Sequence, residues 1–242
     1  MRDSQDGWRH PWRAATVAAI LDLVTSRSAN HAPVQPLATD GRARVRVIVV
    51  DDHAAVREGI RAMLGSDPDI DPIAAVATAR EAVALADRHR PDVMVLDYHL
   101  PDLDGLSLCL RLKGTVTPPA VLIYSAFADE RLVALAIVAG ADALLSKAAD
   151  PEALCDIVRA LADGGERLPA VAPATMQAVA SQLDTTDLPI FGMLAHGTPP
   201  VEIATTLRID RECLDMRRRG MLSRLAGRSQ DRPPPGRQPR VS

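Results

Sequence analysis

Two stretches of the chain place acidic side chains directly after short apolar runs. VRVIVV, residues 45–50, is followed by Asp51 and Asp52, and DVMVL, residues 92–96, is followed by Asp97. Uninterrupted apolar, largely β-branched residues suit strands that are covered on both faces of a parallel sheet. Because parallel strands end at one edge, the three carboxylates can converge where open α/β sheets place their ligand sites. Clustered carboxylates repel one another unless a cation neutralises them, and hard oxygen ligands suit Mg²⁺.

Two further apolar runs add a hydroxyl and an ammonium group. AVLIYS ends at Ser125, and ADALLSK ends at Lys147. An acidic pair by itself is most often a solvated turn, so the prediction depends on all the positions together. The expected pocket holds three acids, one hydroxyl and one lysine.

These five positions, in this order and spacing, resemble the site of a two-component response regulator receiver domain, over about residues 44–162. The loop LDYHLPDLDG resembles the phosphoacceptor loop of that family, and GADALLSKAA resembles its segment around the lysine. The resemblance implies that Asp97 accepts a phosphoryl group from a sensor histidine kinase. The other roles that it implies are Mg²⁺ ligation by Asp51, Asp52, Asp97 and the backbone carbonyl of His99, and phosphoryl contacts from Ser125 and Lys147.

One switch position departs from the family pattern. Many relatives carry an aromatic residue three positions before the lysine, and Leu144 stands there in this chain. A leucine cannot move a phenol ring between exposed and buried states, so two outcomes stay open for Leu144: weaker switching, or switching by another route. His99 is interpreted either as a side chain that contacts the phosphoryl group or as an exposed loop imidazole.

Apolar periods and turn residues predict that strand and helix alternate five times through the receiver region. The pattern predicts an α/β fold, a flavodoxin-like doubly wound sheet of five parallel strands, followed by a small all-α helix-turn-helix domain. In the first helix, residues 54–64, the spacing of Val56, Ile60, Met63 and Leu64 predicts a buried stripe. The predicted strands are 45–50, 70–77, 92–96, 120–124 and 141–146, and the later helices are 79–89, 106–112, 129–139 and 151–162.

The C-terminal part is predicted to contain four helices, at 174–182, 188–196, 200–207 and 211–225. Gly and Pro at 163–173 predict a linker before them. Residues 183–226 resemble the LuxR/NarL/FixJ-type DNA-binding domain. The features that carry this resemblance are LAHG before the turn, VEIATTL as the scaffold helix, Ile209 in the turn, and MLSRL at the end of the recognition helix.

Charge divides the chain unequally. Residues 208–242 carry ten Arg against four acids, a charge of +6. The overall charge is −3, so residues 1–207 carry −9. A basic C-terminal end suggests an anionic partner, with nucleic acid first. Glu212 and Asp215 stand on the same recognition helix and oppose phosphate binding, so a degenerate domain that no longer binds DNA is the alternative. The predicted DNA-contacting residues are Arg211, Arg217, Arg218, Arg219 and Arg224.

The remaining features bound the function. Residues 1–43 are interpreted as a flexible extension that can form a helix at 12–25, which is either a docking helix or the product of an upstream start site with no function. Residues 228–242 are interpreted as a disordered tail. The three Cys are isolated, and no apolar run approaches the roughly 18 residues of a membrane span, which predicts a cytoplasmic protein. We expect a transcription regulator rather than an enzyme, bound to double-stranded DNA as a homodimer when phosphorylated. The alternatives are a protein-interaction regulator and a phosphorylation-independent regulator.

Overall fold

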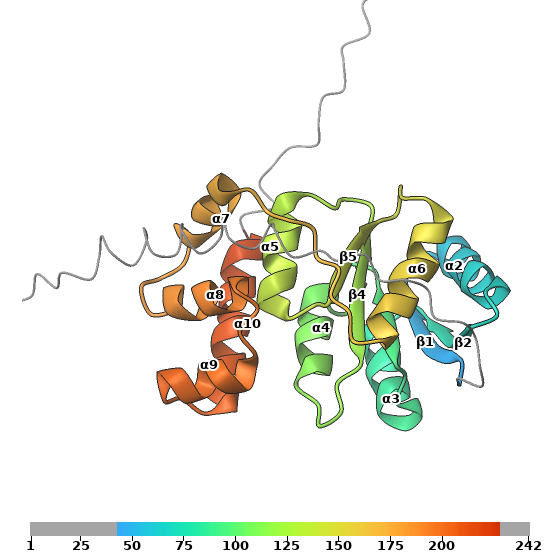
Figure 1. The fold of residues 1–242 in the computed structure, drawn as a ribbon, viewed down its shortest axis with the longest axis horizontal. Coiled ribbons are helices and arrows are strands. Elements are labelled where there is room, and N and C mark those ends of the chain that lie inside the picture. Colours follow the sequence, from blue (N-terminus) through green and yellow to red (C-terminus); the bar gives the residue numbers. More distant parts are fainter. Residues whose placement is uncertain (1–42, 228–242) are drawn as a thin grey trace, which may run out of the picture.

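The computed structural model describes residues 43–227 (Figure 1), and the predicted N-terminal extension and C-terminal tail lie almost wholly outside these residues. Five parallel strands form one sheet in the order β2-β1-β3-β4-β5. Helices α2 and α6 cover one face, and α3, α4 and α5 cover the other. The bounds of the receiver elements are β1 Val45–Val50, α2 Ala54–Ser66, β2 Ile70–Val76, α3 Ala79–His89, β3 Val93–Leu96, α4 Gly105–Lys113, β4 Ala120–Ser125, α5 Glu130–Ala139, β5 Ala143–Ser146 and α6 Pro151–Ala162.

Alternate residues of each strand point into two separate cores, one on each face of the sheet. On β1, Val47 and Val49 pack with α2 and α6, whereas Ile48 and Val50 pack on the face that α4 and α5 cover. This period of two is the strand geometry expected from a buried, uninterrupted apolar run. The predicted doubly wound α/β fold is therefore confirmed.

The helix boundaries follow from local capping. Thr78, Asp104 and Asp129 each accept a hydrogen bond from the backbone N–H three residues later, at the start of α3, α4 and α5. α5 ends at Gly140, whose φ of 74° lies in the left-handed region. One detail of the prediction is wrong: Val56 is 37% exposed and does not join Ile60 and Leu64 in the core, because α2 turns that side toward solvent.

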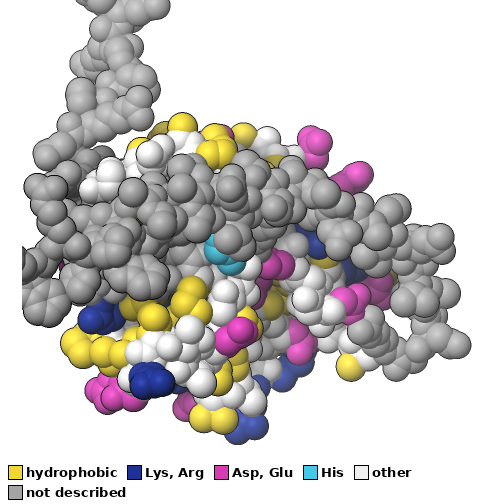
Figure 2. Space-filling model, turned by 60° about the vertical axis from the view of Figure 1, so that its left-hand side comes forward, with side chains coloured by type: hydrophobic (Ala, Val, Ile, Leu, Met, Phe, Trp, Pro, Cys, Tyr) yellow, Lys and Arg dark blue, Asp and Glu magenta, His cyan; other side chains and the backbone are white. Residues whose placement is uncertain are grey.

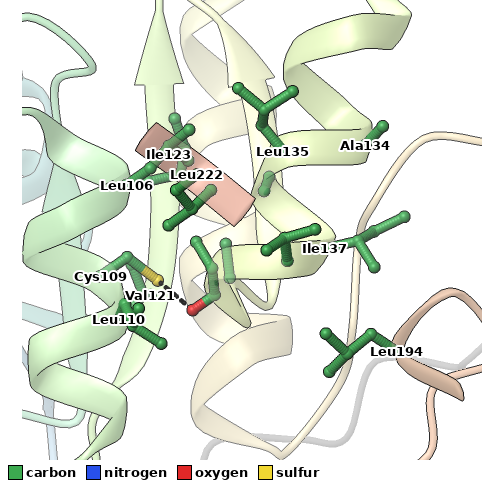
Figure 3. Close-up of a cluster of buried hydrophobic side chains, with 14 of the residues drawn as sticks. Leu106, Cys109, Leu110, Val121, Ile123, Ala134, Leu135, Ile137, Leu194 and Leu222 are labelled. Carbon is green, nitrogen blue, oxygen red and sulfur yellow. Dashed lines mark hydrogen bonds between the residues drawn. The ribbon is translucent and has the colours of Figure 1, made fainter. Parts of the chain in front are cut away.

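Four more helices follow the receiver, and three of them pack against it. α7, α8 and α10 contact α5, and α10 also contacts α4 (Figure 1). Apolar side chains of both parts form one continuous cluster, in which Leu222 and Leu194 lie beside the side chains of α4 and α5 (Figure 3). No helix among the described residues is long and apolar enough to cross a membrane. The bounds of these helices are α7 Pro173–Ala180, α8 Leu188–Ala195, α9 Pro200–Leu207 and α10 Arg211–Gly227.

Packing on two sides explains why α5 lacks a polar face. All residues from Leu132 to Ala139 are buried, since the sheet covers one side and the C-terminal helices cover the other. A helix that is apolar all round is expected where no side faces water. The C-terminal domain is thus an integral part of the hydrophobic core in this arrangement.

Candidate functional site

Three carboxylates converge at the carboxyl edge of the sheet, as the strand ends predict. β1 and β3 are neighbours in parallel register, so Asp51 and Asp97 follow paired residues. Asp51 is 1% exposed and Asp97 is 6% exposed, whereas Asp52 faces solvent. One ligand atom from each of Asp51, Asp52, Asp97 and His53 lies within 4.8 Å of all the others.

Lys147 lies between the two buried acids. Its Nζ is 2.6 Å from Asp51 Oδ2 and 3.0 Å from Asp97 Oδ1. Burial by itself lowers the pKa of Lys147, but its hydrogen bonds to Asp51 and Asp97 outweigh burial and raise that pKa above the ordinary value. The lysine is therefore a permanent cation that partly neutralises the acids.

Backbone groups fix the orientation of both buried carboxylates. The His53 N–H donates to Asp51 Oδ1 at 2.8 Å, and the Tyr98 N–H donates to Asp97 Oδ1 at 2.8 Å. Arg57, from the first turn of α2, donates from Nη1 to the Asp51 carbonyl at 2.6 Å. Gly105 lies so close to the Asp97 backbone that a Cβ there would collide with the Asp97 carbonyl oxygen. Contacts within the chain thus hold the shape of the pocket.

The carboxylate cluster fits a divalent cation. Three carboxylates against one ammonium leave net negative charge, and the donor set is dominated by hard oxygen atoms. His53 Nδ1 lies 2.6 Å from Asp52 Oδ1, so an imidazole also borders this cluster. The ring of His99 packs edge-on against Tyr98 with centroids 4.6 Å apart. A ligand role for the His99 carbonyl stays a prediction.

Ser125 is bound to its own loop rather than to the acids. Its buried hydroxyl accepts a hydrogen bond from the Phe127 N–H at 3.1 Å and lies 3.4 Å from the Phe127 carbonyl oxygen. Phe127 itself is 72% exposed. Leu144 is buried in the core, so it occupies the switch position as a packing residue. A movement of the Ser125 hydroxyl toward Asp97 would break its contacts with this loop.

Two of the predicted DNA-contacting arginines face the receiver. Arg218 is 2% exposed and donates from Nε to the Val138 carbonyl at 2.8 Å, and its Nη1 is 3.4 Å from Asp215 Oδ1. Burial lowers the pKa of Arg218, and Asp215 offsets part of that effect. Arg211 donates to the Lys113 carbonyl at the end of α4 at 2.8 Å. α10 therefore presents this side to the receiver and not to an external ligand.

Two other arginines of α10 hold the start of α8. Arg217 Nη1 is 3.2 Å from Asp187 Oδ1, Arg224 Nη2 is 2.5 Å from Asp187 Oδ2, and Arg224 also pairs with Asp184. α8 begins at Leu188, as predicted, and carries Pro189 in its first turn. Asp187 is buried, so these pairs stabilise the packing of α10 against the start of α8. Arg219 is exposed on α10. Among the described contacts, it is the one predicted arginine that bonds neither to the receiver nor to the start of α8.

Comparison with known proteins identifies the chain. Residues 47–159 match the family described as "Response regulator receiver domain". The DNA-binding transcriptional activator DevR/DosR of Mycobacterium tuberculosis is 31% identical, and the alignment covers 66% of this chain and 78% of the relative. The transcriptional regulatory protein UhpA of Salmonella typhimurium is 32% identical, over 75% of this chain and 91% of the relative. The chain belongs to the two-component response regulators of the LuxR/NarL family.

The structural comparison agrees with this assignment. A LuxR-family response regulator from Aurantimonas sp. SI85-9A1 shares 28% identity with a TM-score of 0.50, over 57% of this response regulator and 97% of that chain. The response regulator RcsB in a complex with DNA shares 17% identity with a TM-score of 0.51, over 75% and 92% of the two chains. At this identity, the likeness to RcsB shows the fold alone.

The structure of this response regulator brings four of the five predicted pocket residues together, and it leaves the Ser125 hydroxyl bonded to its own loop. The contacts of three neighbouring groups were not predicted. Arg57 and His53 adjoin Asp51 and Asp52, and Phe127 is the partner of the Ser125 hydroxyl. Their closeness in sequence to the acids and to the serine was the available signal. The five predicted arginines do not form one exposed patch. Arg217 and Arg224 pair with acids at the start of α8, Arg211 bonds to the end of α4, and Arg218 is buried.

Proposed function

We propose that this response regulator is phosphorylated on Asp97 by a sensor histidine kinase. The observation that carries the proposal is the lysine ammonium held between Asp51 and Asp97 in a pocket at the sheet edge. An Asp97 oxygen attacks the phosphorus of a phosphohistidine, the P–N bond breaks, and the imidazole leaves with the electron pair. Such a transfer needs charge neutralisation more than a strong base.

Asp51, Asp52 and Asp97, with the His99 carbonyl, would hold Mg²⁺. When bound, the cation neutralises charge on the phosphoryl oxygens. The chain supplies the remaining positive charge through Lys147, which pairs with carboxylates before transfer and with the phosphoryl group afterwards. The Ser125 hydroxyl then leaves the Phe127 loop and donates to a phosphoryl oxygen.

The output that we propose is transcription regulation through DNA, in the cytoplasm. It is supported by the DNA-binding activity named for DevR/DosR and by the helix-turn-helix geometry of α9 and α10. Because Arg211 and Arg218 face the receiver, α10 must move away from α4 and α5 before it can enter a major groove. A phosphorylated homodimer would then place two recognition helices on two half-sites. The chain acts as a regulator and not as an enzyme.

Intact mass and DNA affinity test this function together. The protein is incubated with Mg²⁺ and acetyl phosphate beside an Asp97→Asn variant, and its binding to duplex DNA is measured at several salt concentrations. We expect one phosphoryl adduct, absent from the variant, together with dimer formation and a steep salt dependence of DNA binding. No adduct in the presence of Mg²⁺ would refute the phosphoacceptor role.

One observation favours a second candidate, a phosphorylated protein-interaction regulator that does not bind DNA. Residues 173–227 contain six acidic side chains and six arginines, so this region carries no net charge, whereas DNA-binding surfaces are basic. Phosphorylation without any salt-dependent DNA binding would support this candidate over the first.

A further inference from the structure

The segment between the two domains pairs with the edge of the receiver sheet. Arg167 forms a parallel bridge with Ala143 of β5. Its N–H donates to the Asp142 carbonyl at 2.7 Å, and its own carbonyl accepts from the Leu144 N–H at 3.4 Å. The segment therefore pairs with the exposed edge of β5 through one bridged residue, Arg167.

The same segment is held a second time where it enters α7. The carboxylate of Glu130, the first residue of α5, accepts from the Thr175 hydroxyl at 2.5 Å and from the Ala172 N–H at 3.3 Å. Between the two anchors, Leu168 and Val171 pack on the apolar cluster that both domains share. Residues 165–175, which we call the clasp, are thus fixed at both ends.

Both anchors adjoin groups that respond to phosphorylation in the proposed mechanism. β5 ends at Ser146, directly before Lys147, and the Lys147 N–H donates to the Ser125 carbonyl at 2.8 Å. α5 begins after the short loop that Ser125 holds through Phe127. Lys147 and Ser125 each lie within a few residues of a clasp anchor along the chain. Movement of either side chain therefore acts on that anchor.

We propose that the clasp is the element that transmits the phosphorylation state to the C-terminal domain. This inference rests on the proposed phosphorylation of Asp97. When Ser125 and Lys147 turn toward the phosphoryl group, β5 and the start of α5 shift, the clasp detaches, and α10 loses the connection that holds it near the receiver. The route passes through the backbone N–H of Leu144, so it needs no aromatic side chain at that position.

Two pairs of variants test the clasp in the full chain without a phosphodonor, by hydrogen exchange read by mass spectrometry. Arg167→Pro removes the donor to Asp142, whereas Arg167→Ala keeps it. Thr175→Val removes the donor to Glu130, whereas Thr175→Ser keeps it. We expect α10 and clasp peptides to exchange up to about tenfold faster in R167P and T175V than in the matched controls, the effect of losing one hydrogen bond. Unchanged exchange of α10 in both variants would overturn the proposal.

A second experiment follows exchange after treatment with Mg²⁺ and acetyl phosphate. We expect the treatment to accelerate exchange of residues 165–175 in the wild type and to leave their exchange rate unchanged in Asp97→Asn. If intact mass shows full phosphorylation while these peptides keep their protection, the clasp is not the transmitting element. If no phosphoryl adduct forms, the proposed function fails, and the variants without phosphodonor still decide whether the clasp holds the domains together.

Discussion

The buried guanidinium of Arg218 allows a sharp prediction about the contact between the domains. Arg218 is 2% exposed, and its Nη2 has no hydrogen-bond partner in the structure. Its counter-charge, Asp215, is 16% exposed and lies 3.4 Å away. At this distance an effective dielectric of 20 gives an attraction of about 5 kcal/mol, and desolvation of the arginine consumes several kcal/mol of it. The pair should therefore contribute little net free energy, although each charge depends on the other.

A double-mutant cycle measures this dependence. We expect Asp215→Asn to lower the free energy of unfolding by about 3 kcal/mol, because it leaves a buried charge without its partner. Arg218→Met fills a similar volume and removes the charge together with the unpaired Nη2, but it frees the Val138 carbonyl. Its effect should lie within about 1 kcal/mol of zero. In the R218M background, Asp215→Asn should cost almost nothing.

Urea denaturation of the four proteins gives the coupling free energy directly. Arg218→Ala serves as a control for packing, since it removes the charge and also leaves a cavity; it should destabilise the protein more than R218M does. An equal cost of Asp215→Asn with and without Arg218 would refute the reasoning, because it would mean that the carboxylate does not stabilise the buried guanidinium.

Three further predictions concern the pocket and the core. Gly105→Ala should lower stability by about 1–3 kcal/mol and reduce the phosphorylated fraction read by intact mass, because the new Cβ collides with the Asp97 carbonyl; Gly59→Ala, which meets nothing within 4 Å, is the matched control. Lys147→Ala should increase the rise in melting temperature that Mg²⁺ produces, since the cation then neutralises the acids alone; an unchanged rise relative to wild type contradicts this. Burial raises the pKa of Cys109 to about 12, above the ordinary value of about 8.5. The stability that the protonated thiol contributes therefore declines as the pH rises from about 8.5 toward 12. In Cys109→Ala, the free energy of unfolding measured with urea should fall less steeply between about pH 9 and pH 11 than in the wild type.

The pocket was predictable because its geometry follows from strand order alone. Once β1, β3, β4 and β5 are recognised as parallel, their carboxyl ends must share an edge, and Asp51, Asp97, Ser125 and Lys147 must approach one another. Capping residues such as Thr78 and Asp129 likewise act within one turn of the chain, so local sequence was sufficient.

The roles of the C-terminal arginines were not predictable in this way. Whether Arg218 faces DNA or the receiver depends on contacts between residues 80 positions apart, and an arginine count cannot distinguish the two. Arg217 and Arg224 lie on the same helix as Arg218, yet they bind Asp184 and Asp187 within their own domain. The prediction that Val56 is buried was wrong for a similar reason. Helical spacing indicates an apolar stripe on the helix, but it does not indicate how much of that stripe the rest of the protein covers.

The sequence of α5 nevertheless carried a signal for the closed arrangement. From Leu132 to Ala139 every residue is apolar, so a helix at that place cannot turn one face to water without exposing large apolar side chains. A receiver that functions as a separate domain would need a polar outer face on this helix. The uniform apolar run therefore argues that α5 is covered in the resting protein, and it explains why separation of the domains must be driven, by phosphorylation or by a new partner for that surface, rather than occur freely.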